Sequence, residues 1–262
     1  MNFLTMNVFS IFGQNFADLA RQSLVVIVCA FMIGACANND PQSEIQNITE
    51  AYQKAQDYME AGNYRKAIQV FEVLRARFPF SEFSKQLNLE LMYAYYKMGQ
   101  REQAIDTADQ FLRENPTHEK ADYALYIKAL SYFEQDKNFL ERWFRKSTAG
   151  RPPQDAELSF SLFARLLERY PSSEYAADAQ QRMVYLKNRL SAYENEVARW
   201  YIRSGAYVAA LNRAKNAIEL YNGADSNVES LEIMIEAYEE LGMTELANDT
   251  RRVLAENQPA ES

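Results

Sequence analysis

The residue types that most often perform catalysis are scarce in this chain of 262 residues. It contains one histidine, His118, and two cysteines, Cys29 and Cys36. His118 lies in the segment Asn115-Pro116-Thr117-His118, with no cysteine or serine at the spacing of a nucleophile and its base. Zinc sites are built mainly from cysteine and histidine, so the composition argues against one. We therefore predict a protein that is not an enzyme and has no cofactor and no metal site.

One of the cysteines follows a recognisable export pattern. Residues 24–34 form an apolar run that is too short to cross a bilayer as a helix, and Arg21 precedes it, as in a secretory signal peptide. The run ends in Ile33-Gly34-Ala35-Cys36, which resembles the bacterial lipobox. We predict a signal peptide over residues 1–35 and a lipid, such as palmitate, on Cys36. The alternative is a plain signal peptide in which this cysteine occurs by chance.

The residues after the cysteine predict where such a protein would be held. Residues 36–45 are polar and include a proline, which is typical of a tether. Ala37, rather than an aspartate, follows the cysteine, and by resemblance to lipoprotein sorting in Gram-negative bacteria this implies the outer membrane. The net charge of −8 disfavours binding to nucleic acid.

Glycine, alanine and proline recur at a fixed spacing through the rest of the chain. Apolar residues between them repeat every three or four positions, which places them on one face of a helix. The fixed period is the signature of a repeat protein, and its register resembles the tetratricopeptide (TPR) repeat. We predict an all-α fold: a right-handed TPR superhelix, or α-solenoid, of about five helical hairpins over residues 46–259, with a disordered tail at 260–262. The spacing is carried by Gly62, Ala67 and Pro79, by Gly99, Ala104 and Pro116, and by Gly242, Ala247 and Pro259.

Two stretches interrupt the regular pattern. Residues 134–155 form an insertion with a basic cluster and two prolines, in which residues 139–144 could be a short helix. It could be functional or a tolerated surface insertion. Residues 176–202 contain neither proline nor glycine, so they could be one long helix or a linking helix followed by the first helix of repeat 4. The other helices are predicted over residues 45–59, 62–79, 87–98, 101–114, 121–133, 156–170, 207–220, 228–241 and 244–256.

The first helix of each hairpin lines the concave side of a TPR array. Counting back from the turn glycines places aromatic residues on that side in the first three repeats, more than a solvated face should carry. We predict a substrate-peptide groove there, although some of these tyrosines could instead belong to the core. The groove residues are Tyr52, Gln56, Leu89, Tyr93, Tyr96, Tyr123 and Tyr126.

Four strings at repeat positions resemble the TPR lipoprotein family of the outer-membrane β-barrel assembly (BAM) machine. They are RFPF at residues 77–80, MYAYYK at 92–97, NPTH at 115–118 and VYLKNRL at 184–190. The resemblance implies a periplasmic scaffold that helps outer-membrane proteins to fold and insert. Its N-terminal half would bind the unfolded substrates. Its C-terminal half would dock on the POTRA domains of the barrel protein BamA, with the other BAM lipoproteins nearby.

The docking surface is predicted from a basic run in the C-terminal repeats, Arg199, Arg203, Arg213 and Lys215. An alternative function is that of another TPR lipoprotein of the outer membrane, one serving pilus secretin assembly or peptidoglycan enzymes. An enzyme with appended repeats is disfavoured, because the signal peptide and five repeats leave no stretch for a catalytic domain.

Overall fold

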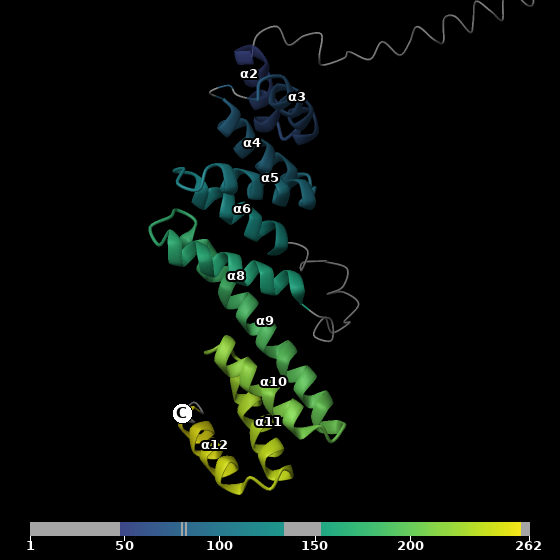
Figure 1. Ribbon diagram of the computed structural model, residues 1–262, viewed down its shortest axis with the longest axis vertical. Coiled ribbons are helices and arrows are strands. Elements are labelled where there is room, and N and C mark those ends of the chain that lie inside the picture. Colours follow the sequence, from purple (N-terminus) through teal and green to yellow (C-terminus); the bar gives the residue numbers. More distant parts are fainter. Residues whose placement is uncertain (1–47, 80, 82, 134–152, 258–262) are drawn as a thin grey trace, which may run out of the picture. The chain divides into compact units, whose positions relative to one another are not determined.

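The computed structural model describes residues 48–79, 81, 83–133 and 153–257, and helices make up most of this part of the chain (Figure 1). No β-strand occurs among these residues, and the predicted all-α solenoid is confirmed. The signal peptide, Cys36, the tether, the short helix at 139–144 and the tail at 260–262 all lie outside the described residues. The helices are α2 (Ile48–Glu60), α3 (Tyr64–Arg77), α4 (Ser84–Lys97), α5 (Arg101–Glu114), α6 (Ala121–Phe133), α8 (Gln154–Arg169), α9 (Ala176–Arg203), α10 (Tyr207–Leu220), α11 (Asn227–Glu240) and α12 (Thr244–Asn257).

From α3 to α12, each helix packs against the next one along the chain. Two contacts skip a helix: α4 also touches α6, and α9 also touches α11. These are contacts between the first helices of neighbouring repeats, as expected for stacked hairpins that each need a neighbour to bury their apolar faces. None of the described helices combines the length and the apolar character needed to cross a membrane.

The turn glycines of the repeats adopt the left-handed conformation that the pattern predicts. Gly62 has φ of 71° between α2 and α3, a backbone conformation that glycine adopts without steric cost. Its N–H donates to the carbonyl of Met59, and the next residue, Asn63, accepts a hydrogen bond from the N–H of Lys66 to cap α3. The other repeat turns copy this geometry at Gly99, Gly205 and Gly242, with φ of 69°, 71° and 71°.

The repeated alanines mark where neighbouring helices approach most closely. Ala67, Ala104, Ala210 and Ala247 are all fully buried. A larger side chain at any of them would force the helices of the hairpin apart, because protein interiors are close-packed. Large buried rings, including Phe71, Phe111 and Phe163, fill the wider spaces.

Residues 176–203 form one helix, α9, which settles the alternative that the sequence left open. Its N-terminal half packs Ala179, Leu186 and Leu190 into the core shared with α6 and α8. Its C-terminal half packs Ala198 against α10 and α11. One helix therefore closes repeat 3 and opens repeat 4.

Two helices begin two or three residues earlier than predicted. α4 begins at Ser84, three residues before the first strongly apolar position, Leu87. α8 begins at Gln154, inside the predicted insertion, because Pro153 caps its N-terminus. The acidic side chains of Asp155 and Glu157 lie in its first turn, where the helix dipole favours negative charge.

Candidate functional site

An open pocket of about 210 Å³ lies where α4, α6 and the start of α9 meet. Leu89 and the ring of Tyr123, both predicted groove residues, form part of its wall. Leu89 is only 5% exposed, so it serves mainly as core and presents little surface to the pocket. The lining consists of Gln86, Leu89, Glu90, Lys120, Tyr123 and Tyr175.

Three tyrosine rings form one continuous surface at this pocket. Tyr175 stacks on Tyr126, with ring centroids 4.6 Å apart, and lies 5.7 Å from Tyr123. The Tyr126 hydroxyl donates a 2.6 Å hydrogen bond to Asp178. Burial above all, and then this carboxylate, raise the pKa of Tyr126 to about 12. The hydroxyl therefore stays protonated at neutral pH and remains a donor.

Glu90 supplies the negative charge of the pocket. Its carboxylate accepts a 2.6 Å hydrogen bond from the side-chain amide of Gln86. Burial raises the pKa of Tyr123, and the charge of Glu90 adds to the effect. Burial also raises the pKa of Tyr52. The hydrogen bond from Gln56 lowers this pKa, and the charge of Glu90 raises it. Glu90 thus lies near tyrosines of both α2 and α6.

The remaining predicted groove residues extend this surface along α2 and α4. Gln56 donates a 2.8 Å hydrogen bond to the hydroxyl of Tyr52. Tyr93 meets Tyr64 edge-on at 6.2 Å, and the Lys97 ammonium lies over the Tyr93 ring. In the first three repeats the structure therefore gathers the predicted residues into one region. Tyr93, Tyr96, Tyr123 and Tyr126 are each partly buried against the same core cluster.

The sequence patterns missed the contribution of α9 to this surface. Tyr175 is the N-cap residue of α9 and does not occupy a repeat position. Counting positions along the repeats therefore could not identify it. Arg182 pairs with Asp178 and lies over the ring of Phe133, 4.8 Å from its centroid. Tyr185, 48% exposed, meets the same ring edge-on at 5.7 Å. The sequence signal that could have revealed this part of α9 was Tyr185, which lies within the VYLKNRL string.

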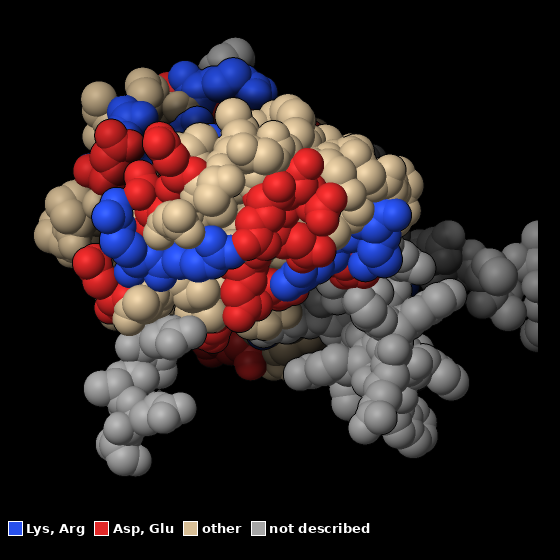
Figure 2. Space-filling view, turned by 90° about the horizontal axis from the view of Figure 1, so that it is seen from below, with Lys and Arg blue, Asp and Glu red and all other residues tan. Residues whose placement is uncertain are grey.

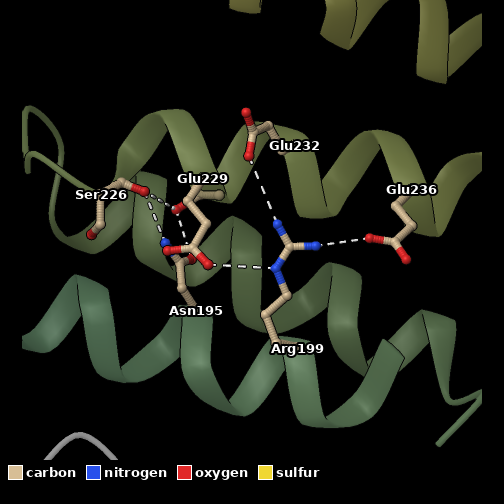
Figure 3. A network of polar contacts seen from close by, with 7 residues as sticks. Asn195, Arg199, Ser226, Glu229, Glu232 and Glu236 are labelled. Carbon is tan, nitrogen blue, oxygen red and sulfur yellow. Dashed lines mark hydrogen bonds and ion pairs between the residues drawn. The ribbon is translucent and has the colours of Figure 1, made fainter. Parts of the chain in front are cut away.

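In the C-terminal repeats three of the predicted docking residues, Arg199, Arg213 and Lys215, have contacts within the chain. Arg199 of α9 lies among three carboxylates of α11 (Figure 3). Its guanidinium is 2.8 Å from Glu236, 3.4 Å from Glu229 and 3.7 Å from Glu232. These contacts join the first helices of repeats 4 and 5.

The other three basic residues differ in their surroundings. Arg213 donates to both carboxylate oxygens of Glu194, at 3.1 and 3.2 Å, and Glu194 is only 6% exposed. The Lys215 ammonium lies 5.8 Å from the centre of the Tyr238 ring. Arg203, in the last turn of α9, is exposed. Basic and acidic side chains lie side by side on the face drawn in Figure 2.

His118 is held by contacts within the protein. Its Nδ1 accepts a hydrogen bond from the N–H of Lys120, and its ring packs edge-on against Phe111 at 5.2 Å. Among the described residues, no group of three or more histidine, cysteine, aspartate or glutamate side chains is placed to hold a metal ion.

Stacked helical hairpins with left-handed glycine turns define an α-solenoid of the TPR type. Residues 45–254 match the family YfiO, described as an outer membrane lipoprotein. The chain is 38% identical over 245 residues to the outer membrane protein assembly factor BamD of Neisseria meningitidis, covering 91% of this chain and 92% of that protein. It is 36% identical to BamD of Vibrio cholerae, covering 88% and 96%. The chain therefore belongs to the BamD family of outer-membrane lipoproteins.

A putative kinesin light chain of Podosopora anserina with TPR-like repeats aligns with a TM-score of 0.37 and 14% identity, covering 79% of this chain and 92% of that one.

Proposed function

We propose that this protein is a non-enzymatic scaffold of outer-membrane protein assembly, held at the periplasmic face of the outer membrane by a lipid on Cys36. Family membership and the name of its relatives, assembly factors, support this role over secretin or peptidoglycan work. Mass spectrometry of the exported protein tests the anchor. A diacylated or triacylated N-terminal Cys36 is expected, and an unmodified N-terminus at another residue contradicts it.

The tyrosine surface of the first three repeats is proposed to bind unfolded outer-membrane proteins through their C-terminal strand. A barrel strand alternates apolar and aromatic residues with polar ones, because one side faces lipid. Tyrosine suits such a segment, since its ring offers apolar area and its hydroxyl can pair with free backbone groups. The observation that carries the proposal is a set of tyrosines partly buried against one core cluster, two of which, Tyr123 and Tyr175, line an open pocket.

Tyr93→Ala tests this binding. Truncating an aromatic anchor at a peptide interface reduces the binding free energy by about 2 kcal/mol, which corresponds to a roughly 30-fold loss of affinity. We expect that loss for a fluorescent peptide of alternating aromatic and polar residues, measured by anisotropy. Tyr207→Ala, a half-buried tyrosine of the C-terminal half, is the matched control. If the two variants bind the peptide with equal affinity, the proposal that this groove binds the peptide is contradicted.

Tyr126 is a poorer probe of the groove than register alone suggested. Its ring stacks on Tyr175 and its hydroxyl bonds Asp178, so Tyr126→Ala would lower the melting temperature together with peptide affinity. Tyr126→Phe keeps the ring and removes only the hydrogen bond, and is the variant to use.

The C-terminal repeats are proposed to dock on the POTRA domains of BamA, near the other BAM lipoproteins. Arg203→Glu is the cleaner test of this surface, because Arg203 is exposed, whereas Arg213→Glu would also break the contact with the buried Glu194. A rim charge acts mainly on association and its salt dependence. We expect slower association of purified POTRA domains with Arg203→Glu at low salt, and a smaller difference at high salt. Identical kinetics would place the interface elsewhere.

A further inference from the structure

Glu90 has an unusual setting for a carboxylate on a helix surface. It is half-buried in the wall of the pocket, among Leu89 and the rings of Tyr123 and Tyr175. Its hydrogen-bond partners are the neutral amide of Gln86 and the neutral hydroxyl of Tyr52. None of the salt bridges in the described part of the chain involves Glu90, so its charge is not neutralised by a basic side chain.

The other carboxylates around the pocket have partners. Arg182 pairs with Asp178 at 2.5 Å, and Lys120 lies 3.7 Å from Glu174 at the exposed rim. Asp122 accepts a 2.6 Å hydrogen bond from the hydroxyl of Ser173. Glu90 is therefore the carboxylate of the pocket lining whose hydrogen-bond partners, Gln86 and Tyr52, are both neutral, and aromatic rings line the pocket beside it.

We propose that Glu90 and the tyrosines around it bind a cationic side chain, lysine or arginine, of the peptide segment that occupies the groove. A carboxylate beside aromatic rings is the arrangement that recognises ammonium and guanidinium groups, through a charge-assisted hydrogen bond and cation–π attraction. This inference rests on the proposed function of the groove and adds to it which side chain the pocket selects.

Lys120 provides the opposing possibility, because it lines the same pocket and could attract a carboxylate instead. Its ammonium, however, is already close to Glu174, and its side chain is 49% exposed, so solvent screens it. Glu90 is half-buried, whereas Lys120 is exposed. The pocket therefore favours a cation over an anion, and the two possibilities predict opposite selectivity.

Three peptides decide between them. Each alternates aromatic residues with threonine, and they differ only at the central position, which is lysine, glutamine or glutamate. With the exported protein, fluorescence anisotropy should show the lysine peptide binding about tenfold more tightly than the glutamine peptide. Added salt should reduce this preference. Glu90→Gln, which keeps the size of the side chain, should abolish the preference, whereas the matched variant Lys120→Gln should retain or increase it.

The outcomes separate this inference from the proposed function. If all three peptides bind equally, the groove binds peptides but Glu90 selects nothing, and the inference is overturned. If the glutamate peptide binds best, Lys120 is the anchor and the inference is likewise overturned. If none of the peptides binds, the proposed function of the groove fails, and the inference fails with it.

Discussion

At the scale of single residues, a buried amide joins α9 to α11. Asn195 is 1% exposed. Its Nδ2 donates a 2.8 Å hydrogen bond to the carbonyl of Ser226, and its Oδ1 accepts one of 2.8 Å from the hydroxyl of Ser230 (Figure 3). Both ends of the amide are therefore used within the protein, and the two repeats are held in register by polar contacts as well as by apolar ones.

Asn195→Ala should lower the free energy of unfolding by about 1–3 kcal/mol, because it removes two buried hydrogen bonds, one to the Ser226 carbonyl and one from the Ser230 hydroxyl. Urea denaturation followed by circular dichroism measures the change. Asn212→Ala, at an exposed position of α10, is the control and should stay within about 0.5 kcal/mol of the natural protein. Similar midpoints for the two variants would show that the amide contributes nothing to the junction.

The individual contacts around the tyrosines were harder to predict than their common face. Register predicts that Tyr93, Tyr123 and Tyr126 lie on one side of the array, and all three pack against the same core cluster, because helical spacing is fixed by backbone geometry. It could not place Tyr175, which precedes a helix. Register also could not predict the pairing of Arg213 with Glu194, because that contact depends on the axial offset between two antiparallel helices.

At the scale of elements, the turn glycines are the positions where one added carbon should have a measurable effect. Gly99 has φ of 69°, and a Cβ built there meets no atom within 4 Å. Gly99→Ala should therefore cost about 1–2 kcal/mol of stability through backbone strain alone. Gly99→Asn should cost less, since asparagine tolerates this conformation better. Thermal unfolding of both variants measures the difference, and a loss with asparagine as large as with alanine would point to a clash instead.

Elements bounded by glycine and proline could be predicted closely, since these residues stop helices for local reasons. α9 could not be decided in the same way. Helix formers run through all 28 of its residues, and a continuous helix and two short ones satisfy the same local preferences. Tertiary packing decides the outcome, because the N-terminal half is held by α6 and α8 and the C-terminal half by α10 and α11.

At the scale of the whole molecule, buried tyrosines make stability depend on alkaline pH. Burial, more than any other cause, raises the pKa of Tyr95, Tyr126 and Tyr221 from 10.0 to about 12. Above pH 10 the unfolded chain loses these protons while the folded protein retains them. The free energy of unfolding should therefore be constant below pH 10 with respect to these groups and fall as the pH rises toward 12.

Urea titrations at several pH values above and below 10 measure this slope. Tyr95→Phe removes one of the buried hydroxyls, which donates to Glu72 at 2.6 Å, and should make the slope shallower. A slope that is unchanged in this variant would mean that the tyrosines of the folded protein titrate as they do in the unfolded chain.

The continuous α9 also limits how this array can change in evolution. Repeat proteins gain and lose whole units, because each unit touches only its neighbours and the turns between units can be cut and rejoined. The segment 115–120, between α5 of repeat 2 and α6 of repeat 3, offers such a joint. Between repeats 3 and 4 the chain has no joint, since the residues that close one unit and open the next share a single helix. Recombination there would sever a helix between Leu190 and Ala198, so we expect the two units to be inherited together.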